Sequence, residues 1–481
     1  MSQICNNNNC NNPIFQNLGE CALHCEKNDY HSDRMSGLLS EFSQKLEEYI
    51  DDEFDGNPLV LAEIIFPTRD SRDGFDYMKL LIKIQEIHFL RCIFHLKTLD
   101  LYPNKIFYDE CIFVNEFYIY PINMLENALD SVFSICKFTK NIEILGINVD
   151  NENNKNNKFE YPLFSDCSFG KRLSINNCSF DESIFNNQDE RLILDNLKID
   201  DCSFNDKCLL NFSDIDLLEI YDCEFLSKLE IKDSNIGKLI FKNSNVKGIF
   251  DSFESSFTQF QMEKSIFEDF AGFEKVVFGK KSKDYLSFFT YVTFKNFSNF
   301  REAQFLSGLD LSRVNLKEQP NFLNAYIEPK NTNRETFRII KNSFDKNGNH
   351  IEANKYFSQE MKAYKRELDN NEDKDNRWTK LVIKLNDLIS DFGESYIKPI
   401  IILLVLVLLY SIIVYLNQHY VLVEPLKSIN GFLNYISINF LPFTKFFENK
   451  KGIEAISLLF YIIFLILIWQ IVIAVKRHTI R

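Results

Sequence analysis

The sequence has no motif that specifies a known catalytic chemistry. It lacks the Gly-x4-Gly-Lys-Ser/Thr loop for nucleotide phosphates, the His-Glu-x-x-His helix of zinc proteases and the Gly-x-Ser-x-Gly turn of serine hydrolases. Histidine is scarce, with seven residues, and only His24 has metal-binding neighbours. His88 and His95 flank Cys92 within an apolar segment, so we interpret them as packing or edge residues. We expect no enzymatic activity.

An excess of positive charge is also lacking. The 54 basic side chains face 68 acidic ones, and the net charge of -14 repels phosphate backbones. We therefore expect no nucleic acid among the partners. Residues 1–12 have neither the basic start nor the apolar run of a signal peptide, so we expect the N-terminal part to be cytoplasmic. The length of 481 residues predicts about three domains.

Disulfide bonds are not expected, although the chain has twelve cysteines. Seven of them lie in Cys-x-Phe triplets that alternate with charged residues: Cys92, Cys111, Cys136, Cys167, Cys178, Cys202 and Cys223. A small apolar residue two places before a phenylalanine fits the inner side of an extended segment. We interpret these cysteines as reduced core residues.

Two long apolar stretches stand near the C-terminus. Residues 399–418 contain no charge, and residues 455–475 contain only Ser457 and Gln470 as strongly polar members. Each stretch matches the roughly 20 helical residues that cross a bilayer, whereas the alternative is a buried helix of a soluble protein. We predict two transmembrane helices, with Gln470 bonding across a helix interface.

Basic residues predict the orientation of these helices. Lys476, Arg477 and Arg481 follow the second stretch, and Lys380, Lys384 and Lys398 precede the first. The loop of residues 419–454 holds only four lysines. The rule that basic residues stay inside places both termini in the cytoplasm and the loop outside.

A five-residue spacing of large apolar residues fills the middle of the chain, between Phe164 and Phe305. This period fits neither a helix nor a simple strand. One-residue slips occur between Leu209 and Ile215 and between Phe225 and Ile231. The spacing is shown by the runs Leu194, Ile199, Phe204, Leu209 and Ile231, Ile236, Phe241, Val246.

This spacing resembles the pentapeptide-repeat family, whose members are right-handed quadrilateral β-helices with four five-residue sides per coil. The chain departs from the family in having Phe more often than Leu at the central position and in lacking a regular Asp or Asn before it. The resemblance implies a mainly β-solenoid fold with degenerate pentapeptide repeats. About seven coils over this segment would form a rod of roughly 35 Å.

The N-terminal segment has the spacing of a small metal-binding knuckle. It reads Cys5-x4-Cys10-x10-Cys21-x2-His24, with Cys25 as a substitute ligand. We predict one structural zinc ion held by Cys5, Cys10, Cys21 and His24, since four protein ligands leave no position for a reactive water. The alternative is a disordered tail with incidental cysteines.

The flanking segments are expected to be helical or irregular. Residues 37–54 predict an amphipathic capping helix, and residues 58–150 irregular early coils with helical insertions. Residues 334–368 predict a helical hairpin that resembles the joint between repeat rods and two-span membrane segments in bacterial and archaeal proteins. We expect an amphipathic stretch over 378–392 to lie along the inner membrane surface or against this hairpin. The predicted domains are 1–35, 36–158, 159–330, 331–395 and 396–481.

Two functions remain open. The first is a membrane-anchored solenoid that binds a cytoplasmic protein partner as a scaffold, at a bacterial inner membrane. The alternative is a homo-oligomeric, ion-channel-like protein with a large cytoplasmic solenoid. No glycine lies between Phe432 and Lys451, where a potassium filter needs several, so we expect a loop of a non-potassium type. We favour the scaffold because the solenoid is the largest part and offers extended binding faces.

Overall fold

The computed structural model describes thirteen segments of the chain. They are residues 4–7, 10–16, 18–27, 37–54, 58–68, 77–98, 105–120, 131–146, 158–186, 191–281, 285–370, 377–421 and 453–479. The chain divides into two compact units, Met1–Asn331 and Thr332–Arg481. Each unit is described by itself.

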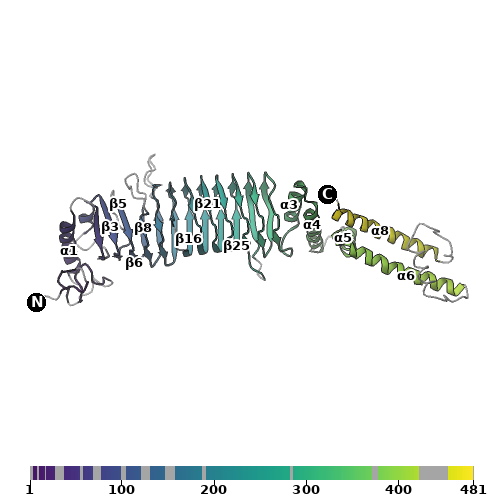
Figure 1. Cartoon of the computed structure of the whole chain (residues 1–481), viewed down its shortest axis with the longest axis horizontal. Helices are drawn as coiled ribbons and strands as arrows, with labels where there is room; N and C mark the ends of the chain where they lie inside the picture. Colours follow the sequence, from purple (N-terminus) through teal and green to yellow (C-terminus); the bar gives the residue numbers. More distant parts are fainter. Residues whose placement is uncertain are drawn as a thin grey trace. The chain divides into compact units, whose positions relative to one another are not determined.

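The first unit is a parallel β-solenoid of about 10 turns (Figure 1). This confirms the predicted solenoid, and the turns begin well before the regular spacing does. Two five-stranded sheets contain the early strands: β1 (Leu59–Ala62), β3 (Glu86–Leu90), β5 (Lys105–Asp109), β8 (Phe133–Ser134), β12 (Phe164–Ser165), and β2 (Ile65–Phe66), β4 (Ile93–Phe94), β6 (Ile112–Phe113), β9 (Lys137–Phe138), β13 (Ser168–Phe169).

The later turns share one extensive sheet and one narrow sheet. The extensive sheet contains β7 (Phe117–Ile119), β10 (Ile142–Leu145), β11 (Lys158–Phe159), β14 (Arg172–Asn176), β15 (Ser179–Phe180), β16 (Leu192–Asp200), β17 (Ser203–Phe204), β19 (Ser213–Tyr221), β20 (Glu224–Phe225), β22 (Asn235–Lys242), β23 (Asn245–Val246), β25 (Ser256–Glu263), β26 (Ile266–Phe267), β28 (Val277–Phe278), β29 (Ser287–Phe294), β31 (Gln304–Phe305), β32 (Leu309–Leu316) and β33 (Tyr326–Ile327). The narrow sheet contains β18 (Cys208–Leu209), β21 (Lys228–Glu230), β24 (Ile249–Asp251), β27 (Ala271–Gly272) and β30 (Ser298–Asn299).

Each regular turn has 21 residues, one more than four five-residue sides. Hydrogen bonds such as Cys223 N to Ser244 Oγ join residues 21 apart in the sequence. The buried positions show that the extra residue lies between Phe204 and Leu210. The sequence interpretation of Leu209 as inward was therefore wrong by one position: Leu210 is buried and Leu209 is partly exposed. Phe225 and Ile231 repeat this six-residue step on the next turn.

Aromatic stacking and small side chains fill the narrow core. Phe204 is stacked between Phe180 and Phe225, with ring centroids 5.2 and 4.8 Å apart. All twelve cysteines are free, as the sequence predicted. The thiol of Cys223 is 3.0 Å from the carbonyl oxygen of Tyr221, to which it donates, and Ser244 occupies the equivalent place on the following turn. Cys and Ser therefore serve the same packing role at this corner.

The early turns are irregular, as expected. The register partners Phe66, Phe94, Phe113 and Phe138 are unevenly spaced in the sequence. The short helix α2 (Met78–Leu81) is one insertion between these turns. The predicted polar loop of residues 148–158 lies almost wholly outside the described residues.

Helix α1 (Leu38–Glu53) caps the start of the solenoid. The apolar spacing predicts an inner face of Leu38, Leu39, Phe42, Leu46 and Ile50; the first four are buried, and Ile50 is partly exposed. The Phe42 ring lies 5.8 Å from that of Phe66 and 5.2 Å from that of Tyr77. The helix thereby covers apolar side chains of the first turn, which have no preceding turn to stack on.

The second unit begins with the predicted helical hairpin, α3 (Arg334–Lys346) and α4 (His350–Asn370). Asn333 caps α3 by accepting a 2.8 Å hydrogen bond from the Thr336 amide. Gly348 has a φ of 72° in the turn, a conformation that glycine adopts without strain. Phe344 stacks on Tyr356 at 5.5 Å across the hairpin.

The remaining described helices are α5 (Arg377–Ser390), α6 (Ile397–Val421) and α8 (Glu454–Thr479). Helices α6 and α8 contain two segments long and apolar enough to cross a membrane, Ile397–Leu416 and Ile456–Arg477. They pack through a small cluster that includes Val407, Tyr410 and Phe464. Many of their other apolar side chains are exposed, for example Val405 and Leu459. The loop of residues 422–452, on which the channel hypothesis depends, lies outside the described residues.

Candidate metal centre

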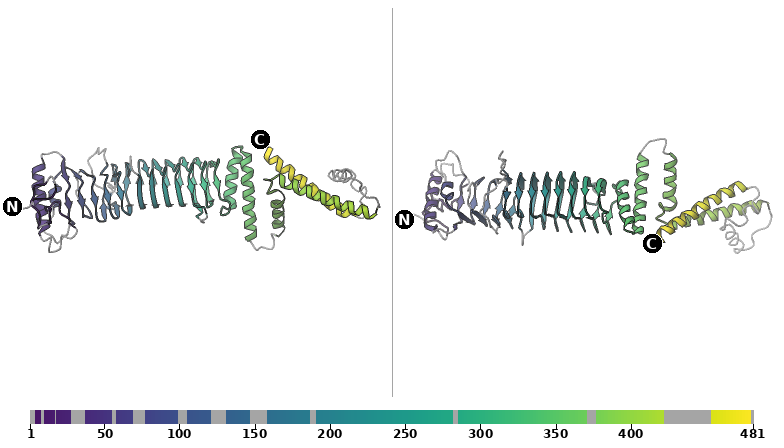
Figure 2. Two further views of the ribbon diagram at one scale, coloured as in Figure 1. Left: turned by 60° about the horizontal axis from the view of Figure 1, so that its bottom comes forward. Right: turned by 90° about the horizontal axis from the view of Figure 1, so that it is seen from above.

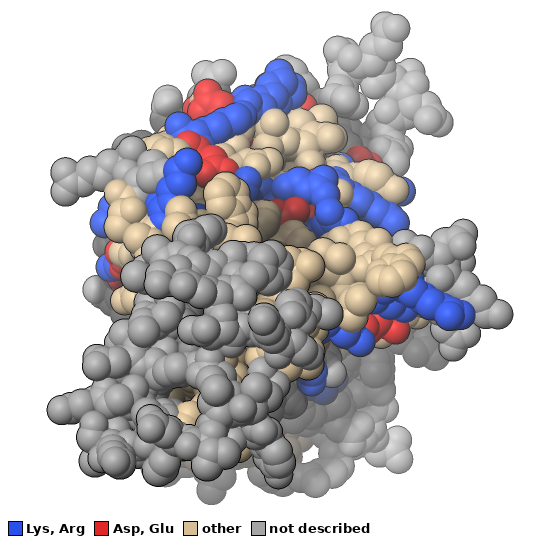
Figure 3. Space-filling model, turned by 90° about the vertical axis from the view of Figure 1, so that its right-hand side faces the viewer, with Lys and Arg blue, Asp and Glu red and all other residues tan. Residues whose placement is uncertain are grey.

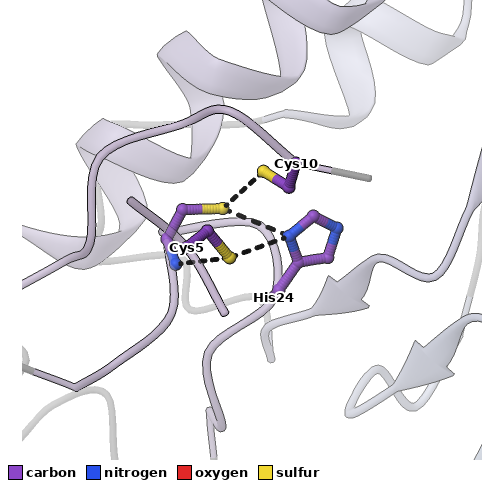
Figure 4. Close-up of side chains that lie close together, drawn as sticks. Cys5, Cys10 and His24 are labelled. Carbon is purple, nitrogen blue, oxygen red and sulfur yellow. Dashed lines mark hydrogen bonds between the residues drawn. The ribbon is translucent and has the colours of Figure 1, made fainter. Parts of the chain in front are cut away.

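The four predicted metal ligands come together in the N-terminal segment. The ligand atoms of Cys5, Cys10, Cys21 and His24 all lie within 4.8 Å of one another. Figure 4 shows the labelled side chains of Cys5, Cys10 and His24 converging on one space. The cluster is partly buried, with Cys5 and Cys21 the most enclosed. These residues could therefore hold a metal ion.

The distances fit a tetrahedral ion of zinc size. Zinc bonds of 2.0–2.3 Å to nitrogen and sulfur imply edges of roughly 3.8 Å between two sulfurs and roughly 3.6 Å between sulfur and nitrogen. The Sγ atoms of Cys10 and Cys21 are 3.6 Å apart. His24 Nδ1 lies 3.6 Å from Cys5 Sγ and 3.2 Å from Cys21 Sγ. Only small adjustments would place all four atoms around one ion.

Short backbone hydrogen bonds hold the four residues in place. Cys5 N donates to Asn12 O at 2.9 Å, and Cys10 N to Asn7 O at 3.0 Å. The last two ligands lie on one turn, where His24 N donates to Cys21 O at 3.1 Å. The segment contains no regular helix or strand in its described part, so a bound ion would supply folding free energy that secondary structure does not.

Cys25 does not belong to the cluster, which corrects its interpretation as a substitute ligand. Its thiol lies 3.8 Å from the ammonium nitrogen of Lys27. Lys27 is 1% exposed and donates to the carbonyl oxygens of Cys25 at 2.7 Å and Leu23 at 3.2 Å. Burial lowers the pKa of Lys27 to about 8. Sequence reasoning missed this buried lysine, because lysine side chains usually reach water.

Burial also governs protonation within the cluster. It raises the pKa of the Cys21 thiol to about 12 and lowers the pKa of His24 from its ordinary value. The imidazole is therefore neutral at pH 7, which is the form that binds a metal, whereas the thiol must release its proton when an ion enters. Four protein ligands would complete a tetrahedral shell, which is typical of a structural site.

The N-terminal segment that carries the Cys/His cluster is attached to the first strands of the solenoid. Ile65 N donates to Leu23 O at 2.9 Å, and Asn7 Nδ2 donates to Glu63 Oε2 at 3.0 Å. Ile65 begins β2, the edge strand of its sheet. Buried His95 lies 3.4 Å from Glu26 Oε1 and so contacts this segment without joining the cluster. The segment covers a sheet edge that would otherwise be open to pairing.

The other histidine singled out in the sequence lies elsewhere. His88 Nε2 is 3.0 Å from Glu86 Oε1, and its ring lies 4.9 Å from that of Phe107. It is an outward, partly exposed residue of β3, in agreement with its interpretation as an edge residue. It has no part in the metal cluster.

The solenoid surface carries a second feature that bears on function. A groove of about 440 Å³ follows one corner column, lined by Lys158, Asn177, Cys178, Ser179, Asp201, Cys202, Ser203, Asp222 and Glu224. Its side chains are mostly polar or acidic.

No family model, curated protein or solved structure matches the chain. Its function must therefore be inferred from its own geometry.

Proposed function

We propose that this chain is a membrane-anchored solenoid of the pentapeptide-repeat type that acts as a non-catalytic scaffold. Helices α6 and α8 would anchor it in a bacterial inner membrane, with the solenoid and both termini in the cytoplasm. The observation that carries the proposal is the contrast between the units. The solenoid buries most of its large apolar residues, whereas α6 and α8 expose many of theirs, for example Leu459 at 58% and Val405 at 55%. Lipid is the medium that such side chains require.

The 21-residue turn supports the pentapeptide-repeat assignment. Buried central residues advance by five positions from Ile199 to Phe204 and from Leu210 through Ile215 to Ile220. One side has a sixth residue, which acts like a bulge and leaves the inward pattern of the other sides intact. The repeats are therefore degenerate in sequence and regular in space.

The outer surface of the solenoid is suited to contact with proteins. Ion pairs cover much of it, such as Lys247 with Glu224 at 2.7 Å and Lys275 with Glu254 at 2.7 Å. Exposed pairs of this kind add little stability and leave the surface soluble. Ile193 and Phe212 interrupt this pattern, with exposed fractions of 63% and 58%. They lie on adjoining turns, since Leu192 N donates to Phe212 O at 3.1 Å.

We further propose that Cys5, Cys10, Cys21 and His24 bind one zinc ion. Three sulfurs and one imidazole nitrogen favour zinc over calcium or magnesium, which prefer oxygen. The ion would be structural and would hold the N-terminal segment against β2.

Two experiments test the scaffold. Alkaline carbonate washing of bacterial membranes should leave the full chain in the pellet, and its release would contradict an integral anchor.

A photo-reactive amino acid at Phe212 should capture one protein reproducibly in cells. The same group at Leu226, a 37% exposed residue elsewhere on the solenoid, serves as the control. Equal capture at both positions would contradict a specific binding face.

A further inference from the structure

Helix α5 has two apolar faces, and only one of them is covered by protein. The covered face bears Ile383, which packs in a cluster with Leu368 and Phe392. The exposed face bears residues spaced three and four apart, so they lie on one side of the helix. These residues are Trp378 at 77% exposure, Leu381 at 48%, Val382 at 60%, Leu385 at 45% and Leu388 at 70%.

Contacts hold α5 at the ends of the two apolar helices. Ser390 Oγ donates to Gln470 Oε1 of α8 at 3.0 Å, which confirms that Gln470 bonds across a helix interface. The Arg477 guanidinium donates to the carbonyl oxygen of Phe392, and Ile389 packs against the α6–α8 cluster. Both views of Figure 2 show α5 between α4 and the α6–α8 pair, running crosswise to α6. This is the direction of a helix that lies in a membrane surface.

Exposed apolar residues also stand at the start of α6. Residues 391–395 separate α5 from Tyr396 and Ile397, which are 43% and 54% exposed. Tyrosine is a residue typical of the headgroup region, and isoleucine of the hydrocarbon. Exposed apolar side chains thus occur both on α5 and at the start of α6, the helix that faces lipid on the proposed function.

Basic side chains accompany this apolar face. Arg377, Lys380 and Lys384 lie on α5, and Lys398 and Lys476 lie near the ends of α6 and α8. Lys384 Nζ is 3.2 Å from Asp369 Oδ1, an exposed pair of the weak kind. Figure 3, which views the molecule from the end where α6 and α8 are drawn in Figure 1, shows basic side chains interspersed with acidic ones on the described surface. On α5 itself, basic side chains stand beside the apolar ones. Such a surface attracts anionic headgroups.

We propose that the exposed face of α5 is a lipid-binding surface that lies in the headgroup region of the cytoplasmic leaflet and prefers anionic phospholipids. The apolar side chains enter the boundary between headgroups and acyl chains, and the basic side chains contact the phosphates. This inference rests on the proposed membrane anchoring, because α5 reaches the bilayer only if α6 and α8 span it. It assigns α5 the role of fixing the α3–α4 hairpin to the membrane surface.

The two tryptophans of the chain allow a direct test. Trp378 lies on α5 and Trp469 on α8, so each single-tryptophan variant reports one location. The full chain with Trp469→Phe is reconstituted into phosphatidylcholine vesicles that contain lipids brominated near the headgroup. We expect loss of Trp378 fluorescence by bromine and weak quenching by aqueous iodide. Quenching by iodide alone would overturn the proposal.

The Trp378→Phe variant separates failure of the inference from failure of the anchor. Its remaining Trp469 should be quenched by brominated lipid whether or not α5 binds lipid. Quenching of Trp469 without quenching of Trp378 would refute the lipid-binding surface alone. Absence of both would refute the membrane anchor and, with it, the inference. A disulfide-linked dimer formed through Leu388→Cys would show that a second copy covers the face, which also overturns the proposal.

The preference for anionic lipid is tested by adding an anionic lipid to the vesicles and by neutralising single lysines of α5. Mixing phosphatidylglycerol into the vesicles should increase bromine quenching of Trp378. Lys380→Gln and Lys384→Gln should each lower the ratio of lipid-bound α5 to α5 detached from lipid by about fivefold in those vesicles. The effect should be far smaller in phosphatidylcholine alone. Lys355→Gln is the matched control, because Lys355 lies on α4 beside Glu352. Equal effects of all three changes would contradict specific contacts of α5 with anionic lipid.

Discussion

Removing one ligand of the metal cluster should abolish stable zinc binding, whereas removing a neighbouring cysteine should not. Cys10→Ser deletes a sulfur that lies 3.6 Å from Cys21 Sγ. Cys25→Ser makes the same chemical change at a thiol that points to Lys27, 3.8 Å from its ammonium nitrogen. Comparing the two variants therefore tests whether the lost sulfur belongs to the proposed metal site.

The expected loss of zinc affinity follows from the number of protein ligands that remain around the ion. Loss of a residue that merely orients a ligand costs about 10–100-fold in metal affinity, so loss of one of four direct ligands should cost at least about 100-fold. Cys25→Ser should stay within a few-fold of the parent. A serine at position 10 leaves three ligands and an open coordination position, in which only a water or hydroxyl oxygen can replace the sulfur.

The assay measures zinc in the purified full chain by mass spectrometry and its affinity by competition with a chromogenic chelator. We expect one zinc per parent chain and per Cys25→Ser chain, and a strong loss for Cys10→Ser. Absence of zinc from the parent after purification and zinc addition would refute the metal site. Equal loss in the two variants would show that the cysteines act through folding of the segment and not as ligands.

The other predictions concern the solenoid and the loop. Phe204→Ala should lower the free energy of unfolding of the solenoid by about 3–5 kcal/mol in chemical unfolding, because the stacked ring of Phe204 is buried. Phe212→Ala should cost less than about 0.5 kcal/mol, because Phe212 is exposed. Equal effects of the two changes would contradict the assigned core. Burial tends to raise the pKa of Glu230, but hydrogen bonds from Lys228, Lys232 and Asn211 outweigh it and lower the pKa to about 2. Ionised Glu230 therefore contributes about 1–2 kcal/mol to the free energy of unfolding, after allowance for solvent screening. This contribution is present above the unfolded-state pKa near 4.3 and is lost as the pH falls from about 4.5 to 2. Glu230→Gln should remove that part of the pH dependence, and an unchanged stability profile would contradict it. The full chain in planar bilayers should show no potassium-selective current, and currents abolished by changes at Ser437 or Thr444 would contradict the scaffold.

The sequence predicted those parts of the fold that depend on periodic burial. The five-residue spacing indicated the solenoid, and the absence of charge indicated α6 and α8. The sequence interpretation placed Leu209 in the core because Leu209 and Leu210 are adjacent leucines. Leu209 points inward if this side has five residues, and Leu210 points inward if it has six. That choice depends on packing against the next turn, where Phe225 and Ile231 make the same six-residue step.

The metal cluster was predictable because its ligands are chemically distinctive and close together in the chain. Cys25 was harder to assign, since sequence spacing alone does not distinguish it from its neighbours. Its partner Lys27 is buried by contact with Phe42 of α1, whose ring lies 5.3 Å from the ammonium nitrogen. The amphipathic pattern of α5 indicated burial of one face, whereas the exposure of the opposite apolar face became evident only from its packing against α4.

The membrane topology tests the central claim most directly. Reporter enzymes that are active on only one side of the membrane are fused after Arg481 and inserted within residues 420–450 of the full chain. We expect the reporter at Arg481 to lie in the cytoplasm and the inserted reporter to lie outside. Location of both reporters on the same side would show that α6 and α8 do not cross the bilayer as a pair, and would contradict the anchored scaffold.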